Sequence, residues 1–290
     1  MSRPRALAWL LAATTVWGAT FPVVKGALAD CGPLTFMALR FGLAALLLLW
    51  DLLRPGVGIP RTVWPYWCGV SLMVGYWLQT WGLVSTTPAR SAFITALSVV
   101  LVPLLEPLAG LARLSGRVMA GGALALVGLG ALLRPDSQAV ALGDILTVGC
   151  AISFAFHTML VQRAVRSHSA RQVNAVQVLV VAVLAAPSAA TEGWHLTATP
   201  RLGGALLVTA LLATVGAFWA LAAAQQALSA GETAVVLAWE PVAAALISLV
   251  LGQDVVTVGL VVGGLLVVAG VIVATTRSRV AGEPLSIVDR

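Results

Sequence analysis

Charged side chains are scarce in this 290-residue sequence, where Asp, Glu, Lys and Arg together make up 10% of the residues. Hydrophobic residues make up 60%, and the mean hydropathy is +0.98. A soluble domain carries far more charge, about a quarter of its residues. The scarcity of charge therefore argues against an ordinary soluble domain and favours a membrane protein.

Cysteine is also rare, with only three residues, Cys31, Cys68 and Cys150, scattered along the chain. This spacing provides neither a disulfide framework nor a metal site. Phosphate-binding loops, metalloprotease motifs and dinucleotide fingerprints are absent from suitable contexts. We therefore expect no metal and no cofactor.

What the sequence does contain is a series of long apolar blocks. A helix needs about 20 predominantly apolar residues to cross a bilayer. Charge, proline and glycine divide the chain into ten such blocks: Ala6–Leu28, Leu34–Leu53, Val63–Val84, Ser91–Leu111, Val118–Leu133, Leu142–Val161, Val173–Ala190, Leu202–Ala224, Thr233–Leu251 and Val255–Thr275. The fold class predicted is an all-α polytopic protein with ten transmembrane helices, embedded in the lipid bilayer.

The net charge of +6 could indicate nucleic-acid binding, but the positions of the arginines indicate membrane topology instead. With a cytoplasmic N-terminus, twelve arginines lie on the inside: Arg3, Arg5, Arg54, Arg61, Arg113, Arg117, Arg163, Arg166, Arg171, Arg277, Arg279 and Arg290. Only Arg90, Arg134 and Arg201 fall in outside loops. This bias predicts cytoplasmic termini, an inner (plasma) membrane location and no nucleic-acid partner.

The second half of the sequence repeats the first. At an offset of 137 residues Trp17 matches Phe154, and at an offset of 142 Trp77 matches Trp219. Three glycines also match at 142: Gly121, Gly122 and Gly128 with Gly263, Gly264 and Gly270. Similarity among Leu-, Ala- and Gly-rich helices is the alternative explanation.

Five spans in each repeat force the two halves into opposite orientations. We therefore predict two inverted five-helix repeats, residues 1–134 and 142–276, followed by a short cytoplasmic tail, residues 277–290. Inverted repeats are common in secondary transporters, whose substrate binds near the midplane between the halves.

Two of the charged residues inside predicted spans are candidate site residues. Arg40 lies near the middle of the second span, where an arginine facing lipid costs about 2.5–3.5 kcal/mol. It should face the bundle interior, as a structural anchor or as an electropositive group on a substrate path. Glu240 precedes Pro241, a residue that can break the helix. Glu240 is a candidate for substrate binding or proton coupling, or for a structural bond.

Aromatic and polar residues complete the candidate substrate-binding set. Residues brought together at the repeat interface can line a cavity, although tryptophans also form interfacial belts and a lone membrane histidine also serves packing. The set comprises Trp17, Phe21, Arg40, Trp77, Gln79, Phe154, His157, Trp219 and Glu240.

Three short motifs, in this order, resemble the EamA family of the drug/metabolite transporter superfamily. They are Trp17-Gly18-Ala19-Thr20-Phe21, Ala38-Leu39-Arg40-Phe41 and Glu240-Pro241-Val242. The resemblance covers nearly the whole chain. It implies export of small metabolites such as amino acids through a cavity between two five-helix halves.

The sequence thus predicts a secondary transporter that exports amino acids or related small metabolites by alternating access, with protons as a candidate coupling ion. An intramembrane enzyme acting on a lipid-linked substrate is the alternative, for which Glu240 and His157 are the available groups. A scaffold without transport activity is a third possibility.

Overall fold

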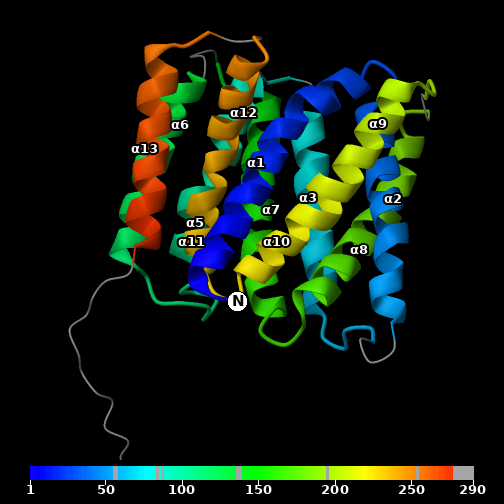
Figure 1. Cartoon of the computed structure of the whole chain (residues 1–290), viewed down its shortest axis with the longest axis horizontal. Helices are drawn as coiled ribbons and strands as arrows, with labels where there is room; N and C mark the ends of the chain where they lie inside the picture. The colour runs from blue at the N-terminus through cyan, green and yellow to red at the C-terminus, as the bar shows by residue number, and fades with distance from the viewer. Residues whose placement is uncertain are drawn as a thin grey trace, which may run out of the picture.

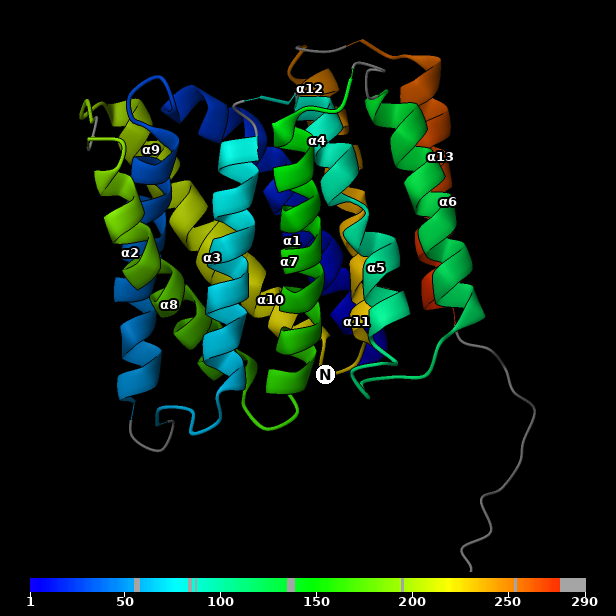
Figure 2. The same cartoon turned by 180° about the vertical axis from the view of Figure 1, so that it is seen from behind.

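The structure, a computed structural model, describes residues 1–54, 58–82, 85–86, 88–134, 139–193, 196–252 and 255–276, without the side chains of residues 21, 22, 25, 88 and 89. These residues form a bundle of helices running roughly side by side (Figure 1, Figure 2). An isolated bridge between Cys31 and Leu196 is the only β-type pairing in the part described. The all-α prediction is confirmed for these residues.

The helices of the first half are α1 (Arg3–Ala27), α2 (Pro33–Leu53), α3 (Trp64–Gly82), α4 (Pro88–Thr95), α5 (Ser98–Leu105) and α6 (Gly116–Leu133). Those of the second half are α7 (Leu142–Ala164), α8 (Ala170–Ala190), α9 (Pro200–Val208), the π-helix η1 (Thr209–Gly216), α10 (Ala217–Ala224), α11 (Ala230–Leu237), α12 (Trp239–Val250) and α13 (Val258–Thr275). Helices α9, η1 and α10 form one continuous helical stretch.

Seven helical stretches within the described residues are long and apolar enough to cross a membrane: Pro33–Leu53, Gly116–Leu133, Leu142–Ala164, Ala170–Ala190, Pro200–Ala224, Ala230–Val250 and Val258–Thr275. Each occupies the place of a predicted span. The other three predicted spans fall on α1, on α3 and on the α4–α5 pair, whose stretch Arg90–Leu105 is shorter. A multi-pass helical membrane protein is supported, and the count of ten spans stays a prediction.

The start of α1 and the end of α13 lie at the same face of the molecule. Nη2 of Arg3, at the start of α1, donates to the carbonyl oxygen of Thr275 at 2.9 Å. The same guanidinium pairs with Glu232 at the start of α11. Figure 1 shows the start of α1 and the end of α13 at the same side. We call this side the terminal face, and the other side the opposite face.

Helices α6 and α13 pack through their glycines and run antiparallel. A Cβ on Gly128 would lie 2.6 Å from the Gly263 carbonyl oxygen, and a Cβ on Gly263 would lie 2.5 Å from the Gly128 carbonyl oxygen. Gly121 and Gly270 meet in the same reciprocal way. We call these four residues the glycine seam. The repeated glycines of the sequence therefore serve close helix contact, as small residues commonly do in membranes.

The fourth span of the second half is interrupted before Pro241. Helix α11 ends at Leu237 and α12 begins at Trp239. Proline has no backbone N–H, so it cannot donate to the carbonyl of Leu237, four residues earlier. The interruption expected from the sequence is therefore present, and it places Glu240 in the first turn of α12.

The first half is interrupted at the matching place without a proline there. The break lies at Ala96 and Leu97, and Ala96 matches Ala238 at the 142-residue offset. The amide of Val99, the counterpart of Pro241, donates to the Ala96 carbonyl three residues back at 2.9 Å. This 3₁₀ turn shows that the break belongs to both halves and does not require proline.

Asp30 joins two loops at the opposite face. Nη2 and Nε of Arg201 donate to its carboxylate at 2.7 and 2.9 Å, and the Thr199 hydroxyl donates to it at 2.7 Å. The hydrogen bond from Arg201, with that from Thr199, lowers the pKa of Asp30 below its ordinary value. Asp30 thereby fixes the start of α9 relative to the end of α1.

We expect Asp30→Asn to lower the unfolding temperature at neutral pH, because an amide cannot replace the charge-assisted pair with Arg201. The pKa of Asp30 is lowered in the folded state, so its stabilisation is present above the unfolded value of about 3.9 and is lost as the pH falls through the lower folded value. Thermal unfolding of both proteins between pH 7 and pH 3 should therefore show curves that converge in acid. Asp51→Asn, which breaks a partly exposed pair with Arg54, serves as the control. Identical unfolding temperatures at neutral pH would contradict the assigned role.

Candidate functional site

Two side chains from the first half reach the π-helix of the second half. Nε1 of Trp17 donates to the carbonyl oxygen of Ala213 at 2.7 Å. Arg40 donates from Nη2 to the same carbonyl at 3.2 Å and from Nε to the Thr214 hydroxyl at 2.7 Å. Arg40 therefore faces the bundle interior, as its position in the second span predicts.

Further side-chain hydrogen bonds involve the same π-helix. In a π-helix each backbone N–H donates to the carbonyl five residues earlier, and such turns occur frequently at functional sites. The Thr214 hydroxyl donates to the Thr209 carbonyl at 3.0 Å, and Asn174 Nδ2 on α8 donates to the Val215 carbonyl at 2.9 Å. Side chains from α1, α2 and α8 thus converge on one short segment, η1.

Aromatic contacts also join the two halves of the chain. The Trp17 and Phe218 rings lie 5.2 Å apart, and the Tyr76 and Phe154 rings lie 5.7 Å apart. Phe41 lies between these two contacts, 5.6 Å from Tyr76 and 6.4 Å from Phe218. The Trp17–Phe218 and Tyr76–Phe154 pairs each take one residue from each half of the chain.

The two ring pairs are equivalent under the sequence repeat. Trp17 corresponds to Phe154 at the 137-residue offset, and Tyr76 corresponds to Phe218 at 142. Exchanging the halves therefore converts the Trp17–Phe218 contact into the Phe154–Tyr76 contact. Four aromatic walls are thus placed symmetrically, whereas the charged residues are not: Arg40 corresponds to Gln177 and Glu240 to Ser98.

Glu240 lies close to Arg40 without being fully buried. Its backbone carbonyl packs against Gly18 of α1, where a Cβ would lie 2.8 Å away. The Glu240 carboxylate and the Arg40 guanidinium interact electrostatically, and Arg40 also interacts with the Tyr76 hydroxyl. Arg40, Tyr76 and Glu240 all retain partly exposed surface. The structure brings these polar groups together between the two halves.

His157 is buried beside this cluster. Its Nε2 lies 2.9 Å from Oε1 of Gln177, and its ring meets Phe218 edge-on at 6.1 Å. Gln177 in turn donates to Asn174, which holds the Val215 carbonyl of η1. This chain of contacts corresponds to the packing alternative stated for His157 and supports the geometry of the π-helix.

Three candidates lie apart from this cluster. Trp77 is 43% exposed and contacts Trp81, on a face of α3 that also exposes Trp67. Trp219 meets the exposed Trp9 edge-on at 5.3 Å, and Gln79 is partly exposed on α3. The side chain of Phe21 lies outside the described residues.

Comparison with known proteins identifies the family. The sequence profile of the EamA-like transporter family matches residues 4–134 and again residues 141–276. The chain belongs to the EamA-like transporter family. This family is part of the drug/metabolite transporter superfamily, so this EamA protein is a membrane transporter with a small-molecule substrate.

One relative and one solved structure extend the comparison of this EamA protein. A protein of Archaeoglobus fulgidus described as an uncharacterized transporter is 30% identical over 269 residues, covering 90% of this chain and 83% of that protein. A crystal structure aligns with a TM-score of 0.83, covering 94% of this chain and 97% of its own, at 22% identity. That second likeness shows the fold alone. Both family and relative point to a transporter rather than an enzyme.

Sequence reasoning missed Tyr76 and Phe218, the aromatic residues that this EamA protein turns inward. Trp77 and Trp219 are identical across the repeat and therefore draw attention, but each follows its inward neighbour by one residue. One residue turns a helix by about 100°, enough to change the face. The available signal was a match of residue class, tyrosine with phenylalanine, at the same offset. Within the described ranges, no three His, Cys, Asp or Glu residues are grouped to hold a metal ion.

Proposed function

We propose that this EamA protein is a secondary transporter that exports amino acids or related small polar metabolites by alternating access. The substrate would bind between the two inverted five-helix repeats, residues 1–134 and 142–276. The site would comprise Trp17, Arg40, Tyr76, Phe154, Phe218 and Glu240, with His157 as support. Trp77, Gln79 and Trp219 stay outside this proposal because they lie apart from the cluster.

The observation that carries the proposal is the pair of equivalent ring contacts across the repeat. Trp17–Phe218 and Phe154–Tyr76 flank the same polar groups, and each joins one half to the other. A rocking motion of one half against the other would open one pair as it closed the other. Transporters with inverted repeats change access in this way around a fixed midplane site.

The charged groups suggest how a zwitterionic substrate would be held. Arg40 has N–H groups beyond those that bond η1 and could bind a carboxylate. Glu240 could bind an ammonium group or carry a proton, since ionisable groups at this depth commonly mark substrate and proton paths. Aromatic faces nearby would stabilise a cation.

The arginine distribution supports an orientation in the membrane. Arg3 and Arg166 lie at the terminal face, where Arg166 donates to the Leu111 carbonyl in the loop between α5 and α6. Cytoplasmic loops carry an excess of arginine. We therefore infer that the terminal face is cytoplasmic and that the protein resides in the inner (plasma) membrane with both termini inside.

Counterflow in proteoliposomes tests this function. Labelled amino acids should accumulate only in vesicles loaded with unlabelled substrate, and Arg40→Gln should reduce that flux about tenfold or more, since a charge-assisted hydrogen bond is worth about 1.5–3 kcal/mol. Arg5→Gln, which removes an exposed arginine, should leave the flux within about twofold, as distant surface changes do. Trp17→Phe, which keeps a ring but loses the bond to Ala213, provides a second variant if Arg40→Gln does not fold.

Two outcomes would contradict the proposal. Flux that is unchanged in both folded Arg40 and Trp17 variants would place the path elsewhere. Conversion of a lipid-linked substrate without any flux would instead support an intramembrane enzyme.

A further inference from the structure

Two ion pairs join the first half of the chain to the second, one at each face of the bundle. At the terminal face Arg3 of α1 pairs with Glu232 of α11, and Nη1 of Arg3 donates to Oε2 of Glu232 at 3.1 Å. At the opposite face Nη2 of Arg90 on α4 lies 2.8 Å from Oδ2 of Asp144 on α7. Figure 2 shows α4 and the start of α7 at that face. Both pairs are formed in the same structure, so the two halves are tied together at both faces.

The two ion pairs occupy equivalent places under the sequence repeat, with acid and base exchanged. Arg90 is the third residue of α4 and Glu232 is the third residue of α11, and the two correspond at the 142-residue offset. Arg3 and Asp144 each lie in the first turn of the first helix of their half. Exchanging the halves therefore converts one pair into the other. Because the residue types differ between the halves, what the repeat shares at this place is the ionic contact itself.

Both ion pairs are shielded from water and fixed in position. None of the four side chains is more than 20% exposed. The Ser229 amide donates to the Glu232 carboxylate at 2.9 Å, and the Ala141 amide donates to the Asp144 carboxylate at 2.8 Å. Each acid is thus positioned by its own helix to receive an arginine of the other half. Exposed ion pairs contribute little, whereas shielded charge-assisted bonds are strong, so each pair favours a closed face.

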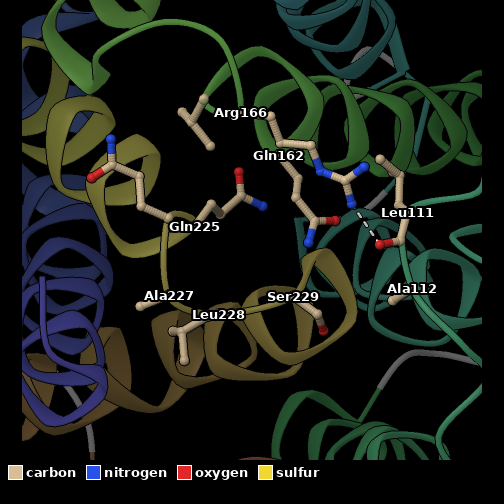
Figure 3. Close-up of a pocket in the computed structure, with 10 residues that line it drawn as sticks. Leu111, Ala112, Gln162, Arg166, Gln225, Ala227, Leu228 and Ser229 are labelled. Atoms are coloured by element: carbon tan, nitrogen blue, oxygen red, sulfur yellow. Dashed lines mark hydrogen bonds between the residues drawn. The ribbon is translucent and has the colours of Figure 1, made fainter. Parts of the chain in front are cut away.

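The start of α11 borders open space. Residues 227–229, the loop before α11, line a cavity of about 540 Å³ together with the ends of α7 and α10 and the loop after α5 (Figure 3). Closely packed elements resist displacement, because any shift forces their neighbours to move. The open space removes this resistance on one side of the loop. The start of α11 can therefore shift away from Arg3 with little repacking on that side.

We propose that these two ion pairs are the gates of the transporter. Arg3–Glu232, the terminal gate, closes the terminal face, and Arg90–Asp144, the opposite gate, closes the opposite face. Each pair breaks when its own face opens, while the other pair stays formed. This inference rests on the proposed alternating access, in which the two faces never open together. Both gates control access to the rings between the halves, which we call the ring cluster: Trp17, Phe41, Tyr76, Phe154 and Phe218.

Labelling of one introduced cysteine from each side of the membrane tests the gates. Tyr76→Cys places a thiol in the ring cluster at a partly exposed position, while the native cysteines are buried. Right-side-out and inside-out vesicles are treated with a membrane-impermeant maleimide. The same proteins without Tyr76→Cys give the background rate, and a separate Gln226→Cys protein, labelled at an exposed position, identifies the side of the terminal face.

Breaking each gate should open one side only. Arg3→Gln should raise the rate of Tyr76→Cys labelling about tenfold from the side of the terminal face and leave the rate from the other side within about twofold. Arg90→Gln should do the reverse. A tenfold change is the effect expected from losing one hydrogen bond to a charged group.

Matched variants separate the gates from a general loss of charge. Arg5→Gln removes an exposed arginine of the same helix as Arg3 and should leave both rates within about twofold. Asp30→Asn breaks a different ion pair at the opposite face, whose Arg201 is 56% exposed, and should also leave both rates within about twofold. Arg3→Glu combined with Glu232→Arg rebuilds the terminal gate with the polarity of the opposite gate. This exchange should slow labelling relative to Arg3→Glu alone.

Each outcome decides for or against the gates. A rise confined to the expected side for each pair supports them, as does slower labelling after the charge exchange. Unchanged rates in folded Arg3→Gln and Arg90→Gln proteins overturn the proposal. A rise from both sides at once also overturns it, because it indicates a loosened bundle. Glu232→Gln and Asp144→Asn break the same pairs from the acidic side and replace an arginine variant that does not fold.

Labelling requires neither substrate nor flux, so the gates and the proposed function fail separately. Side-specific labelling in a protein without amino-acid counterflow would support the gates and reject amino acids as the substrate. Counterflow in a protein whose labelling is insensitive to both ion pairs would support the transporter and reject these gates.

Discussion

Replacing Glu240 with glutamine is expected to abolish accumulation driven by a proton gradient while leaving exchange at equilibrium measurable. Glutamine resembles the protonated carboxyl in shape but cannot release a proton. Glu240 is the acidic residue of the cluster, next to Arg40 and in the first turn of a broken helix. If Glu240 carries the coupled proton, the variant can still bind and exchange substrate, but a proton gradient cannot drive substrate accumulation.

The size of this effect follows from the driving force. A potential of 100 mV is worth about 2.3 kcal/mol per charge, which corresponds to about a fortyfold concentration ratio. Wild-type proteoliposomes with an imposed gradient should approach that ratio for a neutral or zwitterionic substrate. The Glu240→Gln ratio should fall to about one, because no charge is then coupled to the substrate. Labelled amino-acid uptake with and without the gradient provides the measurement.

Ser98 provides the matched control, because it occupies the position of Glu240 in the broken helix of the other half. Ser98→Ala should keep gradient-driven accumulation. A Glu240→Gln protein that still accumulates substrate against a gradient would show that another group carries the proton. Loss of exchange as well would assign Glu240 to substrate binding and not to coupling.

The second large effect is expected at the glycine seam. Gly128→Ala places a methyl group against the Gly263 carbonyl, a backbone atom that cannot rotate away. Helices α6 and α13 must separate, and overpacking of this kind costs about 1–3 kcal/mol or more. Such a loss should lower the unfolding temperature of a domain of this size by several degrees, about 2–4 °C per kcal/mol. Heating followed by fluorescence-detected size-exclusion chromatography provides the measurement.

Two comparisons make this prediction specific to the seam. Gly203→Ala adds the same methyl group on α9 where nothing lies within 4 Å, so it should be neutral or slightly stabilising, since alanine favours helix by about 1 kcal/mol over glycine. Gly128→Ala combined with Gly263→Ala should cost less than the sum of both, because the first methyl group already separates the helices. Full additivity, or equal effects at Gly128 and Gly203, would contradict backbone contact at the seam.

The sequence was sufficient to predict features that depend on residue type and period. Continuous apolar blocks identify candidate spans, and glycines matched at one offset identify the internal repeat. The inward position of Arg40 follows from the cost of placing a charge in lipid. Trp17 and Phe154, matched at 137, both belong to the ring cluster.

What the sequence could not supply depends on rotation about a helix axis. Whether Tyr76 or Trp77 faces inward is decided by about 100° of turn, which a block of apolar residues does not specify. The break at Ala96 has no proline beside it, so only Pro241 in the second half gave a signal. The π-helix Thr209–Gly216 has no residue pattern that would predict it.

That π-helix has a consequence for the whole span in which it lies. A π-helical turn contains more residues than an α-helical turn. Helix α10 is therefore rotated about the helix axis relative to the position it would have in a uniform α-helix of the same 25 residues. Each residue absorbed corresponds to about 100° of winding, the same angle that separates Phe218 from Trp219. The π-helix therefore determines which of two adjacent aromatic rings, Phe218 or Trp219, faces Trp17. Trp17, Arg40 and Asn174 hold the carbonyls of the π-helix in this position through hydrogen bonds.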